Sequence, residues 1–294
     1  MKTVFRLFLL LASFWTLSGC GPSYPTPIPP DILPTAIIQT AEALNATAFA
    51  LTPSPTITFT PTITLTPTST FTPTPIPPAP PARLLIEAPG PMSMLASLIQ
   101  IRLYVVPGET NLVQMALYGE DGRLLWRDQF IVQDVPPPGL ELFLETHFEV
   151  RVAELARLEA RTTDKAGRIE KLTSMHVTLL PVGLSRITPS DPPFERAAIY
   201  NPVPEASVSG GTLSVDGAFW PLNDQPVILE LQAEDGRILM TRQLSLVGDT
   251  HIPFSTTLPY KVSEPTRARL SIRQADPRFN AIAYLYSVLV TLNP

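Results

Sequence analysis

Outside the Pro/Thr-rich region, the histidines are the side chains best suited to catalysis or to metal binding. His147, His176 and His251 have no ligand-spaced or catalytic neighbour. His147 and His251 fall in strand-like segments, where a surface or half-buried histidine is the plainer interpretation. The sequence also lacks Gly-x-Ser-x-Gly, His-Glu-x-x-His and a phosphate-binding loop. We therefore expect no catalytic residues, no metal site and no cofactor, and we predict that the protein is not an enzyme.

Three aromatic residues are the candidates for ligand contact. Trp126, Trp220 and Tyr200 could form an aromatic platform for a sugar, as in carbohydrate-binding modules. Trp220 precedes a proline at the end of an expected strand, where partial exposure is reasonable. Packing in a core or a hinge is the alternative for all three, and the general distribution of tryptophan favours it.

Cys20 is the only cysteine and follows Leu17, Ser18 and Gly19. It is preceded by two basic residues and by the apolar run 7–15, about half the roughly 20 residues that a spanning helix needs. The motif resembles the bacterial lipobox, which implies that residues 1–19 are a lipoprotein signal peptide and that Cys20 is the lipid attachment site. The alternative is an ordinary secretory peptide, but that would leave one free thiol in an exported protein.

Export and anchoring follow from this motif. We expect the chain to be attached to the cell membrane by acyl chains, such as palmitate, and to face the extracellular or periplasmic side. Disulfides are excluded because Cys20 has no partner. The net charge of −5 and the lack of a basic cluster after the signal peptide argue against nucleic acid as a partner.

Residues 20–81 are predicted to be a disordered Pro/Thr-rich stalk. The stretch 52–81 contains neither charge nor glycine, and its closely spaced prolines disfavour helix and sheet. Fully extended, those thirty positions could span roughly 90 Å. Residues 35–51 show a short, weak heptad pattern that favours a transient helix over oligomerisation, so we expect a monomer.

The remainder contains an internal repeat. Residues 117–125 (LYGEDGRLL) recur as 231–239 (LQAEDGRIL), an offset of 114. Arg157-Leu158 followed by Asp164 corresponds to Arg269-Leu270 followed by Asp276, and both copies end on an apolar strand. A period of this length indicates two homologous domains. We place them at 82–184 and 198–294, joined by a linker at 185–197 whose prolines are expected to limit coupling between the domains.

Short strands with alternating polarity predict an all-β fold of two tandem immunoglobulin-like β-sandwiches. Asp121-Gly122 and Asp235-Gly236 predict equivalent hairpins in which both turn residues accept a positive φ. Val150–Arg161 has one helix-like face, from which we expect at most a helical turn before a strand. In the second copy the expected strands are 212–215, 227–233, 237–246, 251–258, 268–273 and 283–292.

The second copy resembles the Gmad2-type immunoglobulin-like domain of bacterial spore-germination proteins. The resemblance lies in Pro202 to Ser209, Leu213 to Ala218, Glu234 to Arg237, Pro253 to Ser255 and Ser287 to Val290, which are turns and core strands. It implies a fold and no particular chemistry. The first copy departs further from the pattern, at Met92 to Met94 and at Arg102-Leu103.

These observations lead to one expected function and two alternatives. We expect a non-catalytic surface lipoprotein whose paired domains bind or position an unidentified envelope protein or glycan. The alternatives are a purely structural spacer and a carbohydrate-binding module associated with a glycan-active enzyme.

Overall fold

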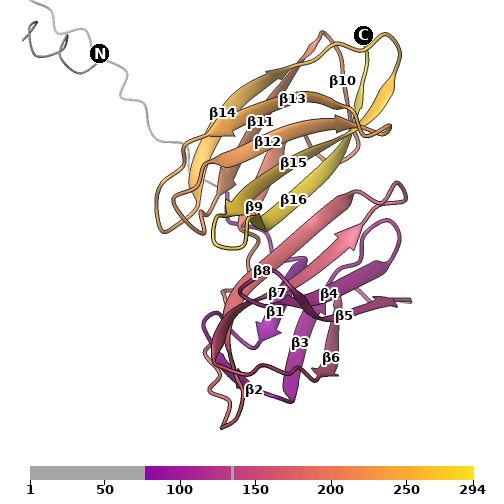
Figure 1. Ribbon diagram of the computed structural model, residues 1–294. Coiled ribbons are helices and arrows are strands. Elements are labelled where there is room, and N and C mark those ends of the chain that lie inside the picture. Colours follow the sequence, from indigo (N-terminus) through magenta and orange to yellow (C-terminus); the bar gives the residue numbers. More distant parts are fainter. Residues whose placement is uncertain (1–76, 134–135) are drawn as a thin grey trace, which may run out of the picture. The chain divides into compact units, whose positions relative to one another are not determined.

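The computed structural model describes residues 77–133 and 136–294 (Figure 1). The signal peptide, Cys20 and most of the stalk expected at 20–81 lie outside these residues. The described part is all-β and forms two β-sandwiches, which confirms the predicted fold class. Both sandwiches belong to one compact unit that begins at Pro73.

Eight strands build each sandwich. The first contains β1 (Leu84–Ala88), β2 (Met94–Ala96), β3 (Ile99–Val105), β4 (Leu112–Tyr118), β5 (Leu124–Ile131), β6 (Leu140–Thr146), β7 (Glu154–Thr163) and β8 (Ile169–Leu180). The second contains β9 (Ala197–Asn201), β10 (Ala206–Val208), β11 (Thr212–Phe219), β12 (Val227–Ala233), β13 (Ile238–Leu244), β14 (Ile252–Pro259), β15 (Thr266–Asp276) and β16 (Ala281–Leu292).

The first sandwich packs a three-stranded sheet, in the order β1-β3-β6, against the strands β8-β7-β4-β5. The short strand β2 pairs in parallel with β8. Strict alternation explains the sheet: in β3 the side chains of Ile99, Ile101, Leu103 and Val105 are buried, and those between them are not. The buried positions of β3, β4, β7 and β8 meet in one hydrophobic core.

The second sandwich repeats this topology strand for strand. Its small sheet has the order β9-β11-β14, its larger one β16-β15-β12-β13, and β10 pairs in parallel with β16. It has its own core, which includes Phe219, Leu229 and Leu270. The sequence repeat is therefore a structural repeat.

The strands predicted for the second copy agree with the observed ones to within a few residues. The segment Val150–Arg161 contains no helical turn, because its alternating residues enter β7, where Ala156 and Leu158 are fully buried. Pairing with both β4 and β8 decides its conformation, which local helical spacing cannot do.

The two Asp-Gly hairpins are equivalent, but their conformation differs from the expected one. Within these two turns, the glycines Gly122 (φ 79°) and Gly236 (φ 87°) have a positive φ and the aspartates do not. Each aspartate instead accepts the backbone N–H two residues later, Asp121 from Arg123 and Asp235 from Arg237. In both hairpins a register shift near the turn accommodates the extra residue.

Replacing either hairpin glycine with valine is expected to lower the free energy of unfolding by about 1 to 3 kcal/mol. An added Cβ would meet no atom within 4 Å at Gly122 or Gly236, so the cost comes from the backbone conformation and not from a clash. Urea denaturation of G122V and G236V measures the loss. Glu234→Val, in the same hairpin but at a residue without positive φ, is the control; a similar loss in all three variants would contradict the explanation.

The sandwiches are joined more closely than the linker composition suggested. β8 and β16 pair antiparallel over three residues, so the two large sheets continue into one ten-stranded sheet (Figure 1). The expected linker 185–197 is itself bound to the first sandwich: the backbones of Arg186 and Met94 exchange hydrogen bonds, and the Ala82 N–H donates to Pro193. The expectation of limited coupling was wrong because composition reports the stiffness of a segment and not what it contacts.

Candidate functional site

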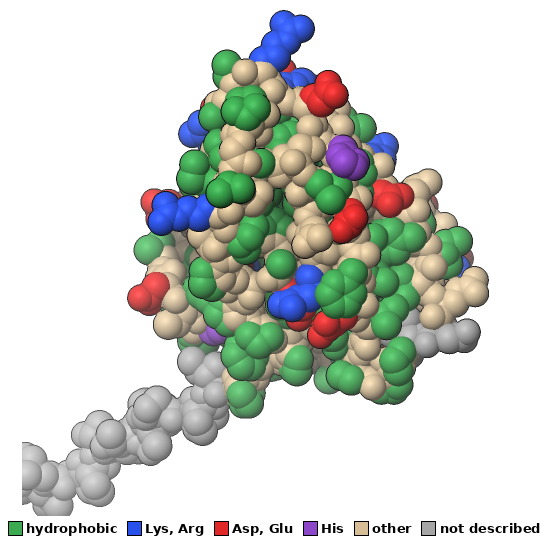
Figure 2. Space-filling model, turned by 90° about the horizontal axis from the view of Figure 1, so that it is seen from below, with side chains coloured by type: hydrophobic (Ala, Val, Ile, Leu, Met, Phe, Trp, Pro, Cys, Tyr) green, Lys and Arg blue, Asp and Glu red, His purple; other side chains and the backbone are tan. Residues whose placement is uncertain are grey.

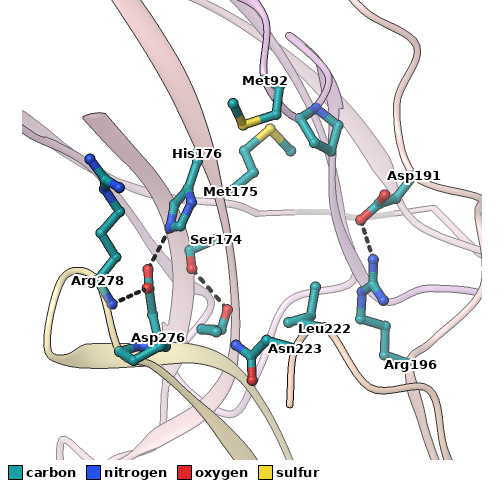
Figure 3. A pocket seen from close by; sticks show the side chains of 13 residues that line it. Met92, Ser174, Met175, His176, Asp191, Arg196, Leu222, Asn223, Asp276 and Arg278 are labelled. Carbon is teal, nitrogen blue, oxygen red and sulfur yellow. Dashed lines mark hydrogen bonds and ion pairs between the residues drawn. The ribbon is translucent and has the colours of Figure 1, made fainter. Parts of the chain in front are cut away.

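A cleft of about 320 Å³ lies at the junction of the two sandwiches (Figure 3). β8 contributes Ser174, Met175 and His176 to its wall, and Met92 lies beside them. The second sandwich contributes the loop after β11 and the turn between β15 and β16. Six of the residues that line the cleft are apolar and seven are polar or charged.

His176 and Asp276 are brought together across this junction, with 2.7 Å between Nε2 and a carboxylate oxygen. Asp276 also accepts the backbone N–H groups of Arg278 and Phe279. Because an ionised carboxylate can only accept, Nε2 donates to Asp276. Among the described residues, no hydrogen bond to Nδ1 is present.

Ser174, His176 and Asp276 have the residue types of a catalytic triad but not its geometry. The Ser174 hydroxyl donates to the carbonyl of Ala283 at 2.8 Å and accepts from Arg157. Its proton is therefore directed at a carbonyl oxygen and not at the imidazole of His176. Activation of the serine would need a serine–histidine hydrogen bond. The arrangement positions the sandwiches and shapes the cleft.

The charged side chains at the rim are already paired. Arg196 donates to Asp191 at 2.6 Å and lies 4.5 Å from the centroid of the Trp220 ring. On the other side Arg278 donates to Glu120 of the first sandwich at 2.6 Å. On the face shown in Figure 2, acidic and basic side chains are scattered among hydrophobic ones.

The junction has a pseudo-two-fold axis. Leu172 of β8 pairs with Leu285 of β16, an offset of 113. The same offset relates His176 to Leu289, which lie opposite equivalent arginines of β7 and β15. Equivalent strands thus pair with each other at equivalent positions, as in the self-complementary interface of a symmetric dimer.

Side-chain contacts follow the same symmetry. The Ser174 hydroxyl donates to the carbonyl of Ala283, and its equivalent Ser287 donates to the carbonyl of Glu170 at 2.7 Å. Both relations have the offset of 113. Each serine also accepts a hydrogen bond from the equivalent arginine of its own sandwich.

Two buried ion pairs cross the junction reciprocally. Arg269 lies 3.1 Å from Asp164, and Arg157 lies 3.9 Å from Asp276. All four side chains are almost completely buried. Burial by itself would raise the pKa of Asp164, but hydrogen bonds from Arg168 and the charges of Arg168 and Arg269 outweigh it and lower that pKa.

A second buried polar group ties the linker to both sandwiches. Glu195 accepts hydrogen bonds from the Tyr284 hydroxyl and from the backbone N–H of Arg83, both at 2.7 Å. Burial raises the pKa of Glu195 and, together with the nearby Glu195 charge, raises that of Tyr284 well above its usual value. Burial also lowers the pKa of Lys171 to about 8.

The three predicted ligand-contact residues lie on different elements. Trp126 is in β5 and packs against the first core. Trp220 and Tyr200 belong to the second sandwich, where the Trp220 ring packs against Arg196 and His251 and the Tyr200 hydroxyl donates to the carbonyl of Pro77. The proposed lipid site, Cys20, lies outside the described residues.

Sequence reasoning missed the cleft and the partner of His176. The histidine and Asp276 are separated by 100 residues, so their contact depends on how the two copies pack. One signal was available: the arginine and aspartate of the junction are shared by both copies. The side chains of these arginines and aspartates are almost completely buried, and buried polar groups need hydrogen-bond partners. In a repeat protein, such residues therefore indicate a contact between the copies.

No protein-family model and no curated protein matches the sequence. Among solved structures, the chain is similar to red sea bream transglutaminase (12% identity, TM-score 0.26), covering 72% of this chain and 32% of that one. It is similar to dimeric latent PorU from Porphyromonas gingivalis (11%, 0.24), covering 72% and 24%. A third similarity is to the calcium binding domain CBD12 of CALX1.1 (9%, 0.22), covering 72% and 100%.

Within residues 77–133 and 136–294, no helix is long and apolar enough to cross a bilayer. No group of three or more histidine, cysteine or acidic side chains there is arranged to hold a metal ion.

Proposed function

We propose that this chain is a non-catalytic, lipid-anchored envelope protein whose two sandwiches act as one rigid binding head. The observation that carries the proposal is the cleft at the junction: its shape depends on both sandwiches, which a shared sheet and two reciprocal buried ion pairs hold in place. A spacer needs no such cleft. Rigid preorganisation of a binding site lowers the entropic cost of association.

The second sandwich fits the proposed relationship to Gmad2-type domains through its turns and core strands. In that view the tandem is a duplicated immunoglobulin-like module on an extended stalk, monomeric and facing the outside or the periplasm. The proposed partner is an envelope component and not nucleic acid, because the chain has a net charge of −5.

Binding by the head is tested by capture from envelope extracts. Immobilised residues 73–294, with a photoreactive crosslinker, are compared with a Leu222→Trp variant, which fills the cleft, and with Met94→Glu, which changes an exposed residue outside its lining. A component captured by the wild type and by M94E but lost with L222W supports the proposal. Identical capture by all three would show that the cleft is not the binding site, and no specific capture would favour the spacer.

Replacing Cys20 with serine is expected to release the protein from the membrane fraction. Acylation needs the thiol, and two acyl chains hold a protein far more firmly than one. Cell fractionation and immunoblotting measure the distribution, with Ser23→Ala, just after the motif, as the control. If C20S stays in the membrane fraction at the wild-type level, the anchor is elsewhere.

A further inference from the structure

Exposed aliphatic side chains gather at one pole of the first sandwich, and none of them lines the cleft. The loop after β8 carries Val182 and Leu184, which are 82% and 90% exposed. Val152, just before β7, and Leu98, just after β2, are also exposed. This pole is the lower end of the molecule in Figure 1, and Figure 2 views the molecule from that end. We call these four residues the apolar tip.

Strand pairing brings the apolar tip together. β2 runs parallel to β8 and ends beside it, so Leu98 and Val182 leave the sheet from neighbouring strands. β7 pairs antiparallel with the other edge of β8, so Val152 lies at the same end. The Phe148 N–H donates to the Ser97 hydroxyl and holds the loop before Val152 against the loop that carries Leu98. The apolar tip is therefore a surface built by three adjoining loops.

The second sandwich folds without aliphatic residues in the corresponding loops. Gly211 directly precedes β11, as Leu98 directly precedes β3. Glu264 lies two residues before β15, as Val152 lies two residues before β7. The fold thus does not require exposed aliphatic side chains at these positions. Exposed apolar residues that cluster, in contrast to scattered ones, mark an interaction surface.

We propose that the apolar tip inserts into the surface of the phospholipid bilayer to which the chain is anchored. The inference rests on the proposed lipid anchor at Cys20 and adds a second contact with the same membrane. Residues 21–76 connect Cys20 to the described part of the chain, and fully extended they could span roughly 170 Å. The bilayer is therefore within reach of the head. Because the anchor keeps the head close to the bilayer, an intrinsically weak contact is sufficient.

The form of the apolar tip favours lipid over a protein partner. Val182 and Leu184 project from a bend with almost their whole surface exposed, whereas the apolar anchors of protein interfaces fill complementary pockets. A fluid acyl layer needs no matching shape. The neighbouring charges of Glu149 and Arg151 are opposite, so burial of aliphatic side chains, and not charge, supplies the free energy of binding.

The test places an environment-sensitive fluorophore on single cysteines in residues 73–294, which contain no natural cysteine. Val152→Cys labels the apolar tip, and Glu264→Cys labels the equivalent exposed position of the second sandwich. Vesicles of phosphatidylethanolamine and phosphatidylglycerol should raise the fluorescence and shift it to the blue at V152C only. Equal changes at both positions, or no change at V152C, would overturn the inference.

Unlabelled variants exclude an effect of the fluorophore. Val182→Asp should weaken partitioning onto the same vesicles, measured by flotation at increasing lipid concentration, by about tenfold or more. Val247→Asp changes a valine of the second sandwich that is 77% exposed, and should partition like the parent. Raising the salt concentration should change the partitioning of the parent by less than about twofold, because insertion of aliphatic side chains is not screened.

The variants also separate this inference from the proposed binding function. Val182 does not line the cleft, so capture at the cleft and partitioning onto vesicles are measured independently. Equal partitioning of the parent and V182D would overturn the inference and leave the proposed binding function intact. A dimer of the parent in size-exclusion chromatography that V182D dissociates would also overturn it, because the apolar tip would then join two copies of the chain.

Discussion

Replacing Arg269 with alanine is expected to lower the free energy of unfolding by about 3 to 5 kcal/mol. Its guanidinium contacts Asp164 and Glu170 across the junction and Ser287 of its own sandwich, and only 3% of Arg269 is exposed. Without it, Asp164 and Glu170 stay buried with less compensation. Because the arginine belongs to one sandwich and both carboxylates to the other, the loss should affect the unit as a whole.

Guanidinium chloride denaturation, followed by tryptophan fluorescence and by circular dichroism, measures this effect. Arg237→Ala is the control, because Arg237 lies at an exposed hairpin and, among the described residues, forms an ion pair only with Asp235. Such a surface pair contributes little. A loss below about 1 kcal/mol for R269A would mean that the buried pairs do not hold the junction.

Lys171→Met is expected to stabilise the protein by about 3 kcal/mol at pH 7, a gain that should disappear toward pH 10.5. Burial lowers the pKa of Lys171 from 10.5 to about 8. Below pH 8 both the folded and the unfolded protein carry the proton, so the full cost of burying the charge is present. Between pH 8 and 10.5 the folded protein binds fewer protons than the unfolded one, so stability rises with pH.

Urea denaturation at pH 7 and pH 9.5, for the parent and for K171M, isolates this contribution because other titrating groups are common to both. Lys165→Met serves as the control, since the Lys165 side chain is 77% exposed. If the difference in stability between K171M and the parent is the same at both pH values, Lys171 does not titrate as its burial requires.

The repeated sandwiches could be predicted because their signals are local. Alternation in segments such as Ile99–Val105 and turns such as Asp235-Gly236 specify strands and hairpins without reference to the rest of the chain. The turn conformation was harder to predict from the sequence. The Asp235 carboxylate accepts a backbone N–H, so the aspartate itself does not need a positive φ. The helical spacing at Val150–Arg161 produced no helical turn before the expected strand, because pairing with two neighbouring strands decided the conformation.

The candidate site could not be predicted because it depends on how two folded units meet. Nothing local to His176 indicates that Asp276 will lie beside it. The proline-containing linker suggested independence, yet Glu195 within it is buried between the sandwiches. Leu172 pairs with Leu285 only when the equivalent strands β8 and β16 meet edge to edge. Only the shared arginine and aspartate of the two copies pointed toward this contact.

Cutting the connection between the sandwiches tests the rigid head most directly. A specific protease site inserted at Gly183, between Val182 (82% exposed) and Leu184 (90% exposed), would separate the chain after β8 and before the bound linker. After complete cleavage of residues 73–294, confirmed under denaturing conditions, native size-exclusion chromatography is run at low micromolar concentration. Both halves are expected to elute together at the position of the uncut protein, because the shared sheet and the buried ion pairs hold them together. Two separate peaks of half the size would contradict it.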